Sequence, residues 1–260
     1  LKFDYEIFVE KLESNRTIPN AKLLGGRINL YPNDRLNIAL LRTAMWGGDG
    51  QSEDLNSFLK LLKGRDKSGD TINQLAGIDL NYKLLTNKNL DLYTQIIGED
   101  QDAFLPTQLI KQFGLGYSFL SNPYPNKLIF EYIDTSPTGI KGDNNRKNFV
   151  YNGIYPDGYR YLKDPIGTAI DGDASKLSMS YNTFLNEKDF INLSISKVEL
   201  NKNSDTKKKY NDRESLNLLN LDYQKKINEN LNLNFKNKFI NFKNTNNKIN
   251  TSINLIYNFN

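Results

Sequence analysis

The sequence predicts an all-β protein, an antiparallel transmembrane β-barrel of which about twelve strands are present. Three observations lead to this prediction. Apolar and polar residues alternate over long stretches, as expected for strands with one apolar and one polar face. The stretches reach about 10 to 13 residues, and a tilted strand needs roughly 9–11 residues to cross a bilayer. Long and short connections also alternate along the chain, which is typical of the two ends of an outer-membrane barrel.

The alternation is illustrated by the stretch in which Ile191, Leu193 and Ile195 oppose Asn192 and Ser194. A soluble β-sandwich or soluble barrel also alternates, but its strands are mostly shorter and its apolar face is packed inside. Here Asn, Gln, Ser, Gly and acidic residues occupy one face over long strands, which favours a polar lumen. Strands are predicted near residues 1–12, 21–31, 35–46, 71–85, 89–100, 108–120, 127–136, 174–184, 189–200, 215–227, 231–243 and 248–259.

The connections test the barrel prediction independently. They centre on residues 13–20, 32–34, 47–70, 86–88, 101–107, 121–126, 137–173, 185–188, 201–214, 228–230 and 244–247. The odd-numbered connections are mostly long and the even-numbered ones are short, with the eleventh as the exception. Antiparallel strands place all odd connections on one side, so we expect the loops at 47–70 and 137–173 to face the outside of the cell. Residues 1–260 are therefore interpreted as one barrel domain.

One stretch between strands has a helical rather than a strand period. Residues 53–63 place Leu55, Phe58, Leu59 and Leu62 on one helical face, and we expect this helix to fold over the mouth of the barrel. Aromatic residues near strand ends are expected to form interfacial girdles. These residues are Tyr31, Trp46, Tyr82, Phe119, Tyr132 and Phe259.

Composition narrows the possible functions. Hydrophobic residues make up 38% and aromatic residues 12% of the chain, with a mean hydropathy of −0.61. The absence of cysteine and histidine excludes disulfides, Ser-His-Asp and Cys-His catalysis and histidine-ligated metal sites. A net charge of +4 with dispersed basic residues does not indicate a nucleic-acid partner. The chain begins inside an alternating pattern without a signal peptide, so we expect a mature fragment whose N-terminal part is missing.

The most irregular stretch is residues 151–173, YNGIYPDGYRYLKDPIGTAIDGD. Glycines and prolines interrupt it, so it is predicted to be a long loop rather than a strand or helix. Long loops in compact proteins usually carry function. The rest of the chain is interpreted as a scaffold that displays this loop.

Four motifs resemble the capsule assembly protein Wzi family. They are RTAMWGGDG at 42–50, YTQIIGEDQDAF at 93–104, FEYIDTS at 130–136 and NGIYPDGYRYLKDPIGTAIDGD at 152–173. The resemblance implies an eighteen-stranded outer-membrane barrel that acts as a lectin and holds capsular polysaccharide at the cell surface. It also implies an N-terminal periplasmic helical part, so this chain corresponds to a C-terminal portion or to a shortened relative. The implied partners are capsular polysaccharide and outer-membrane lipid, and we expect a monomer that binds no nucleic acid.

The candidate ligand-binding residues suit a polysaccharide. Aromatic faces stack on sugar rings, and arginine can bind a uronate carboxylate in a bidentate pair. The candidates are Arg42, Trp46, Tyr151, Tyr155, Tyr159, Arg160, Tyr161, Asp171 and Asp173. Two alternatives remain open: the tyrosines pack the loop upon itself, and Arg42 forms a structural ion pair with Glu99, Asp100 or Glu131. The DGD sequence at 171–173 lacks the ligand spacing of a calcium loop, and we predict no metal and no cofactor.

Four further carboxylates are expected in the lumen or at loop ends, namely Glu99, Asp100, Glu131 and Asp134. Two carboxylates roughly 5–9 Å apart can hydrolyse a glycosidic bond, and alternation points Glu99 and Glu131 towards the lumen. Because no sequence feature marks a nucleophile, we predict that these carboxylates anchor loops and that the protein is not an enzyme. A porin-like channel is the other alternative function.

Overall fold

The structure is a computed structural model that describes residues 2–63, 72–85, 89–102, 105–121, 123–139, 153–202, 213–243 and 246–258. Side chains are described in these ranges except at 99–102, 105–108 and 137–139. Across these ranges, no helix is long and apolar enough to cross a membrane.

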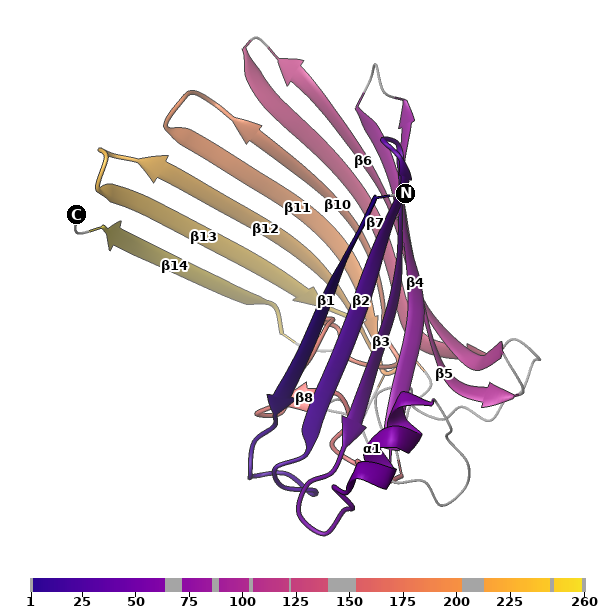
Figure 1. The fold of residues 1–260 in the computed structure, drawn as a ribbon. Helices are drawn as coiled ribbons and strands as arrows, with labels where there is room; N and C mark the ends of the chain where they lie inside the picture. The colour runs from indigo at the N-terminus through magenta and orange to yellow at the C-terminus, as the bar shows by residue number, and fades with distance from the viewer. Residues whose placement is uncertain are drawn as a thin grey trace. The chain divides into compact units, whose positions relative to one another are not determined.

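Twelve long strands make one antiparallel sheet with the order β1-β2-β3-β4-β5-β6-β7-β10-β11-β12-β13-β14 (Figure 1). The strands are β1 (Lys2–Lys11), β2 (Lys22–Asn33), β3 (Leu36–Trp46), β4 (Ile72–Leu85), β5 (Leu90–Asp102), β6 (Leu105–Ser121), β7 (Tyr124–Gly139), β10 (Ser175–Phe184), β11 (Asp189–Leu200), β12 (Glu214–Lys226), β13 (Leu231–Phe242) and β14 (Lys248–Tyr257). Each corresponds to one predicted strand, so the all-β antiparallel prediction is confirmed.

Three strands are longer than the sequence indicates. β5, β6 and β7 contain 13, 17 and 16 residues. The predicted loop at 101–107 was therefore wrong, because only two residues separate Asp102 from Leu105. Pro106 and Pro125 are each the second residue of a strand, where a missing backbone N–H removes little of the hydrogen-bond ladder.

The chain divides into two compact units, which we describe separately. Unit 1 comprises Leu1–Asn81, Thr94–Gln112 and Asp134–Asp173, and unit 2 comprises Tyr82–Tyr93, Phe113–Ile133 and Ala174–Asn260. The prediction of a single barrel domain over residues 1–260 stays a prediction.

In unit 1, the register of β1–β3 separates an apolar face from a polar face. Ile7 pairs with Gly26, which pairs with Arg42, and Tyr5 pairs with Ile28 in the same way. Directly paired residues share a face, and Tyr5 and Ile7 are 67% and 75% exposed. We call this face, with its exposed aromatic and aliphatic side chains, the apolar face of unit 1.

The opposite face of these strands carries polar side chains. Asn29 donates a hydrogen bond to Asp4, and Arg27 forms an ion pair with Asp79 on β4. A soluble sheet hides its apolar face and exposes its polar one. Here the apolar face is exposed, as expected for strands that meet lipid.

Unit 2 repeats the separation in β11–β14. Four apolar residues form a row across these strands, in which Ile195 pairs with Leu219, Leu219 with Phe239, and Phe239 with Ile249. Ile195 and Ile249 are 53% and 66% exposed. Polar side chains occupy the neighbouring positions and therefore the opposite face.

Helix α1 (Leu55–Leu62) packs on the apolar face of unit 1. It begins after the N-cap Asp54, whose carboxylate accepts a hydrogen bond from the backbone N–H of Ser57 at 2.6 Å. Leu61 clusters with Ala44 of β3 and Ile72 of β4. Figure 1 shows the helix beside the ends of β3 and β4.

The helix does not bury the leucines that share its predicted apolar face. Ser57 and Leu61 are buried, whereas Leu55, Leu59 and Leu62 are 73%, 43% and 54% exposed. The helix lies against the apolar side of the strands, and its predicted position over the mouth of the barrel stays a prediction.

A small hairpin of β8 (Arg160–Tyr161) and β9 (Asp164–Pro165) lies within the predicted loop. Its two turn residues, Leu162 and Lys163, have φ angles of 49° and 74°. Two-residue hairpins with positive φ at both positions usually contain Asn-Gly or Asp-Gly. Leucine and lysine give no such signal, so the sequence did not indicate this hairpin.

Candidate functional site

Residues 153–173, which we call the tyrosine segment, are folded against the polar face of unit 1. Tyr155 and Tyr159 are 1% and 7% exposed and join a core with Leu12, Leu23 and Met45. Their ring faces are therefore not available for stacking on a sugar. We correct their predicted role, because in this conformation both side chains hold the segment in place.

Both buried tyrosine hydroxyls have partners in other elements. Tyr155 donates to the carbonyl of Gly47 at 3.1 Å, and Tyr159 donates to the carbonyl of Asn73 at 3.2 Å. Burial raises the pKa of the Tyr155 hydroxyl above its usual value. The first contact joins the WGGDG and GIYPDGYRY motifs, which are far apart in sequence.

An arginine pair fixes the backbone of the tyrosine segment. Arg160 forms an ion pair with Asp171 at 2.6 Å, and both side chains are less than one-tenth exposed. Arg16 donates to the carbonyls of Arg160 and Gly158 at 3.1 and 3.0 Å. Because its charge is paired within the fold, Arg160 is not available as predicted to bind a uronate, and we correct its role accordingly.

The remaining candidates in the segment differ in exposure. Asp173 is fully buried and its backbone N–H donates to the carbonyl of Thr135 at 3.0 Å, so it cannot contact a ligand directly. Asp171 is likewise buried, so its predicted ligand contact is also corrected. Tyr161 is 49% exposed and keeps a ring face open to solvent. Tyr151 lies outside the described residues.

Trp46 and Arg42 both hold helix α1. The Trp46 indole donates to the Ser57 hydroxyl at 3.0 Å, and its ring centroid is 5.5 Å from that of Phe58. Arg42 donates to the carbonyls of Leu61 and Leu62 and to the side chain of Gln74. An ion pair of Arg42 with Glu131 would join the two units and stays a prediction, and the side chains of Glu99 and Asp100 lie outside those described.

The connection between Trp46 and helix α1 is held in place by the side chain of Glu53. Glu53 accepts a hydrogen bond from the backbone N–H of Gly48 at 2.8 Å and pairs with Lys22. These two partners, Lys22 first, lower the pKa of Glu53.

The described carboxylates among those predicted for the lumen or loop ends have structural partners. Glu131 accepts a hydrogen bond from the Tyr93 hydroxyl at 2.9 Å. The Tyr93 ring lies over Gly114, where an added Cβ would come within 1.9 Å of it. Asp134 accepts from the backbone N–H of Ser136 at 2.8 Å. These contacts fit an anchoring role, while the Glu99–Glu131 separation relevant to hydrolysis falls outside the described side chains.

A second candidate site lies in unit 2 and was missed at the sequence level. A groove of about 300 Å³ follows two rows of polar side chains across β11–β14, and we call it the polar groove. One row is Asn192, Asp222, Lys236 and Ser252, and the other is Ser194, Asn220, Lys238 and Asn250. Amides, hydroxyls and ammonium groups at neighbouring positions can hydrogen-bond many hydroxyls and carboxylates at once.

The polar groove is ordered by contacts among its own side chains. Asn220 donates to the Ser194 hydroxyl at 3.0 Å, and Asn192 donates to Asn182 on β10 at 2.6 Å. The polar groove has a net positive charge, because Lys236 and Lys238 outnumber Asp222 in its lining. The sequence did contain a signal, because combining the alternation with antiparallel pairing would have placed these residues in rows.

Comparison with known proteins gives a consistent result. The sequence profile of the family described as Capsule assembly protein Wzi matches residues 2–254. A Klebsiella pneumoniae protein described as an uncharacterized 55.8 kDa protein in the cps region is 32% identical over 110 residues, covering 40% of this chain and 22% of that protein.

Among solved structures, the chain is similar to Wzi of Escherichia coli, described as an outer membrane protein involved in group 1 capsule assembly and a carbohydrate-binding β-barrel. The TM-score is 0.82 at 24% identity, covering 97% of this chain and 55% of that one. At this identity the likeness shows the fold. A comparison with Pseudomonas aeruginosa OccD3 gives a TM-score of 0.35 at 12% identity and covers 98% of this chain and 72% of that one. A TM-score this low does not indicate a shared fold. The chain thus spans about half of the similar Wzi structure and less than a quarter of the Klebsiella protein.

Proposed function

The chain belongs to the Capsule assembly protein Wzi family, and on that premise we propose that it forms part of an outer-membrane barrel that holds capsular polysaccharide at the cell surface. The whole similar Escherichia coli protein is described as a carbohydrate-binding β-barrel of the outer membrane. The proposal extends both properties to this chain.

The membrane location is supported by the reversed polarity of the sheet. In both units one face carries exposed aromatic and aliphatic side chains at alternating positions, such as Tyr5 and Ile7 or Ile195 and Ile249. Such a face is stable against hydrocarbon and unfavourable in water. The tyrosine segment and α1 belong to the long connections, which on this proposal face the outside of the cell.

The polar groove is the observation that carries the glycan-binding part of the proposal. Its rows run across the strands, which are spaced roughly 4.8 Å apart, so hydrogen-bonding groups recur at intervals similar to the length of a sugar ring. Its net positive charge favours an acidic polymer. Each contact is weak, and attachment comes from many such contacts along one polymer chain.

Tyr161 supplies a second contact surface in unit 1. Its half-exposed ring can stack on a sugar, and the hairpin that bears it is fixed by the buried Arg160–Asp171 pair. We propose no catalytic step, and we assign an anchoring role to Glu131, which accepts a hydrogen bond from Tyr93.

Binding of purified capsule from the source bacterium tests the proposal. Replacing both Lys236 and Lys238 by glutamine removes two charges from the polar groove, and we expect affinity for an acidic capsule to fall about tenfold. The loss should shrink at high salt, where the charges are screened. Binding would be measured with the reconstituted protein on an immobilised polysaccharide surface.

A matched control replaces Lys225 and Lys226, which are exposed at the end of β12, by glutamine. This control changes net charge equally, and its affinity should stay within twofold of the parent. Equal losses in both variants would place the contact elsewhere, and failure of the parent protein to bind capsule would refute the proposal. Release of new reducing ends from the polymer would indicate hydrolysis instead.

A further inference from the structure

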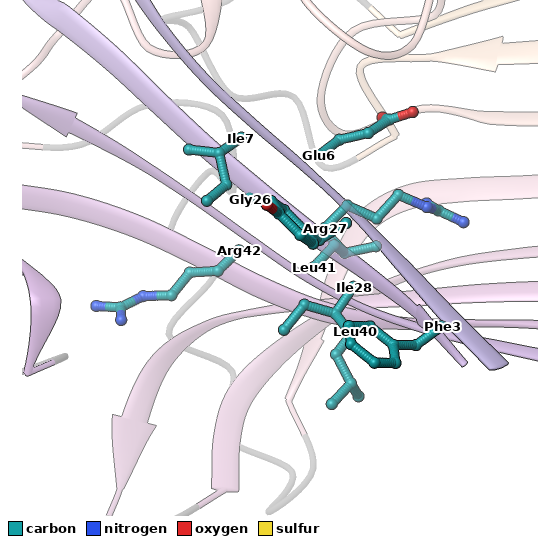
Figure 2. Close-up of a pocket in the computed structure, with 10 residues that line it drawn as sticks. Phe3, Glu6, Ile7, Gly26, Arg27, Ile28, Leu40, Leu41 and Arg42 are labelled. Atoms are coloured by element: carbon teal, nitrogen blue, oxygen red, sulfur yellow. The ribbon is translucent and has the colours of Figure 1, made fainter. Parts of the chain in front are cut away.

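The apolar face of unit 1 contains a groove that the glycan-binding proposal does not use. It has a volume of about 380 Å³, within the range of roughly 300–1,000 Å³ found for ligand pockets. Figure 2 shows residues that line it, which come from β1, β2 and β3. We call it the outer groove; its lining includes Phe3, Tyr5, Ile7, Ile28 and Leu40 around Gly26, and the charged residues Glu6, Arg27 and Arg42.

The outer groove exists because Gly26 has no side chain. Its neighbours in register are Ile7 on β1 and Arg42 on β3, so a side chain is missing in the middle of a three-strand row. A Cβ added at Gly26 would meet only the Glu6 carbonyl oxygen, at 4.0 Å. The space above Gly26 is therefore open on the apolar face.

Helix α1 is tied to one end of the outer groove. The Arg42 side chain, which borders the groove, donates hydrogen bonds to the last helical carbonyls, those of Leu61 and Leu62. The helix also contacts Trp46 on the same face of β3. Exposed apolar surface thus extends from the groove to the helix.

The exposed surface of α1 has an apolar side, formed by leucines, next to the exposed polar side chains of Asn56 and Lys60. Leu55, Leu59 and Leu62 are all exposed, while Asp54 and Lys63 cap the two helix ends. A short amphipathic helix with leucines on one face and charges at its ends is suited to the boundary between lipid headgroups and acyl chains.

We propose that α1 lies in this lipid–water boundary and that the outer groove holds an acyl chain of a membrane lipid. The inference rests on the membrane location in the proposed function. Lipid is the occupant because the groove is continuous with the exposed apolar face of β1–β3, and because Trp46, typical of membrane interfaces, lies where helix and strands meet. The acyl chain would then lie next to the end of α1 that Arg42 binds.

Trp46 is the one tryptophan of the 260 residues and reports on this region directly. The protein would be reconstituted into phosphatidylcholine vesicles whose acyl chains carry bromine near the headgroup or near the chain end. We expect bromine near the headgroup to quench Trp46 fluorescence at least twofold more than bromine near the chain end. Flotation with vesicles but equal or no quenching would overturn the inference and leave the proposed function standing. Failure to float would overturn both.

One pair of variants tests the placement of α1. Replacing Leu55, Leu59 and Leu62 together by glutamine should reduce the shallow quenching at least twofold. The matched change Leu162→Gln, at a 61% exposed leucine of the tyrosine segment, should leave it unchanged. Equal effects of both would overturn the placement of α1.

The groove itself is tested by filling it. Native mass spectrometry with phosphatidylcholine should show one fewer bound lipid in Gly26→Leu than in the parent, while Gly153→Leu, also in open space, keeps it. Unchanged lipid number in Gly26→Leu would overturn the acyl-chain site. Capsule binding should persist in Gly26→Leu, which separates this result from the glycan-binding proposal.

Discussion

The tyrosine segment and helix α1 pack on opposite faces of β2 and β3, and their exposure is the reverse of what their residue types indicate. The segment has polar, sugar-compatible side chains, yet Tyr155 and Tyr159 are buried with Leu23 and Met45. The helix has an apolar face, yet Leu55 and Leu62 are exposed. Burial is therefore decided by what each face of the sheet meets rather than by the polarity of the segment.

The hydrogen bonds explain why the two arrangements are compatible with stability. Each buried tyrosine hydroxyl donates to a backbone carbonyl, so its burial leaves no unsatisfied donor. The exposed leucines of α1 lose nothing if lipid replaces water around them. The tyrosine segment is thus enclosed by protein contacts, whereas α1 is held on one side by Trp46 and Arg42 and meets the surrounding medium on its leucine side.

The largest expected effect comes from the buried ion pair of the tyrosine segment. Arg160→Met leaves the buried Asp171 carboxylate without its partner, and we expect local unfolding of the segment to become easier by about 3 kcal/mol or more. Hydrogen exchange of the amides at 153–173 measures this. The control Arg213→Met removes an exposed pair with Glu199 and should change exchange near it by less than about 1 kcal/mol. Similar small effects in both would mean that the segment is held by its tyrosines alone.

Two neighbouring glycines test the difference between the two faces of β2. A Cβ at Gly25, on the polar face, would lie 2.1 Å from the Phe8 ring, whereas Gly26 faces the open outer groove. We expect Gly25→Ala to lower the free energy of unfolding by about 1 kcal/mol, because the ring of the 43% exposed Phe8 must move aside. Gly26→Ala should be neutral or stabilising by up to about 1 kcal/mol. Urea titration in detergent micelles compares them, and equal losses would contradict the assignment of faces.

Much of the fold could be predicted from the sequence, because alternation over long strands is a local signal. The strands β10 to β14 agree with the prediction to within two residues at each end. The site could not be predicted to the same extent. Whether Tyr155 faces a ligand or Gly47 depends on a contact between residues 108 apart, and no local pattern records it.

The same limit explains what the sequence left open at α1 and in the polar groove. The helical period correctly indicated that Leu55, Leu59 and Leu62 share a face, but not which medium that face meets. In β11–β14 the alternation indicated polar positions, but the rows emerge only from the register, as when Asn220 pairs with Lys238. Exposed Tyr161 remains the one candidate in the tyrosine segment whose predicted sugar contact is compatible with its described surroundings.

An effect of similar size is expected from the Tyr155 hydroxyl. Tyr155→Phe removes its hydrogen bond to Gly47 and should destabilise the tyrosine segment by about 1 kcal/mol. The raised pKa of Tyr155 adds a pH dependence. The folded state keeps the proton that the unfolded state releases near pH 10. The stability contributed by the protonated hydroxyl is therefore full below pH 10 and is lost as the pH rises through the higher folded pKa. Proteolysis of the segment by subtilisin should therefore accelerate above pH 10 in the parent more than in Tyr155→Phe.

The smallest expected effect concerns the cap of α1. Asp54→Ala removes the acceptor for the Ser57 N–H, and amides of α1 should exchange about fivefold faster, while those of the tyrosine segment stay unchanged. The backbone N–H of Ser57 lowers the pKa of Asp54 below its ordinary value of 3.8, so the cap is fully formed above that pH and is lost as the pH falls through the lower folded value. If α1 is held mainly by lipid, transfer from detergent to vesicles should reduce the effect of Asp54→Ala, because lipid contact then adds to the stability of the helix. An effect of equal size in both media would show that α1 is held by its protein contacts, and would remove the difference from the tyrosine segment.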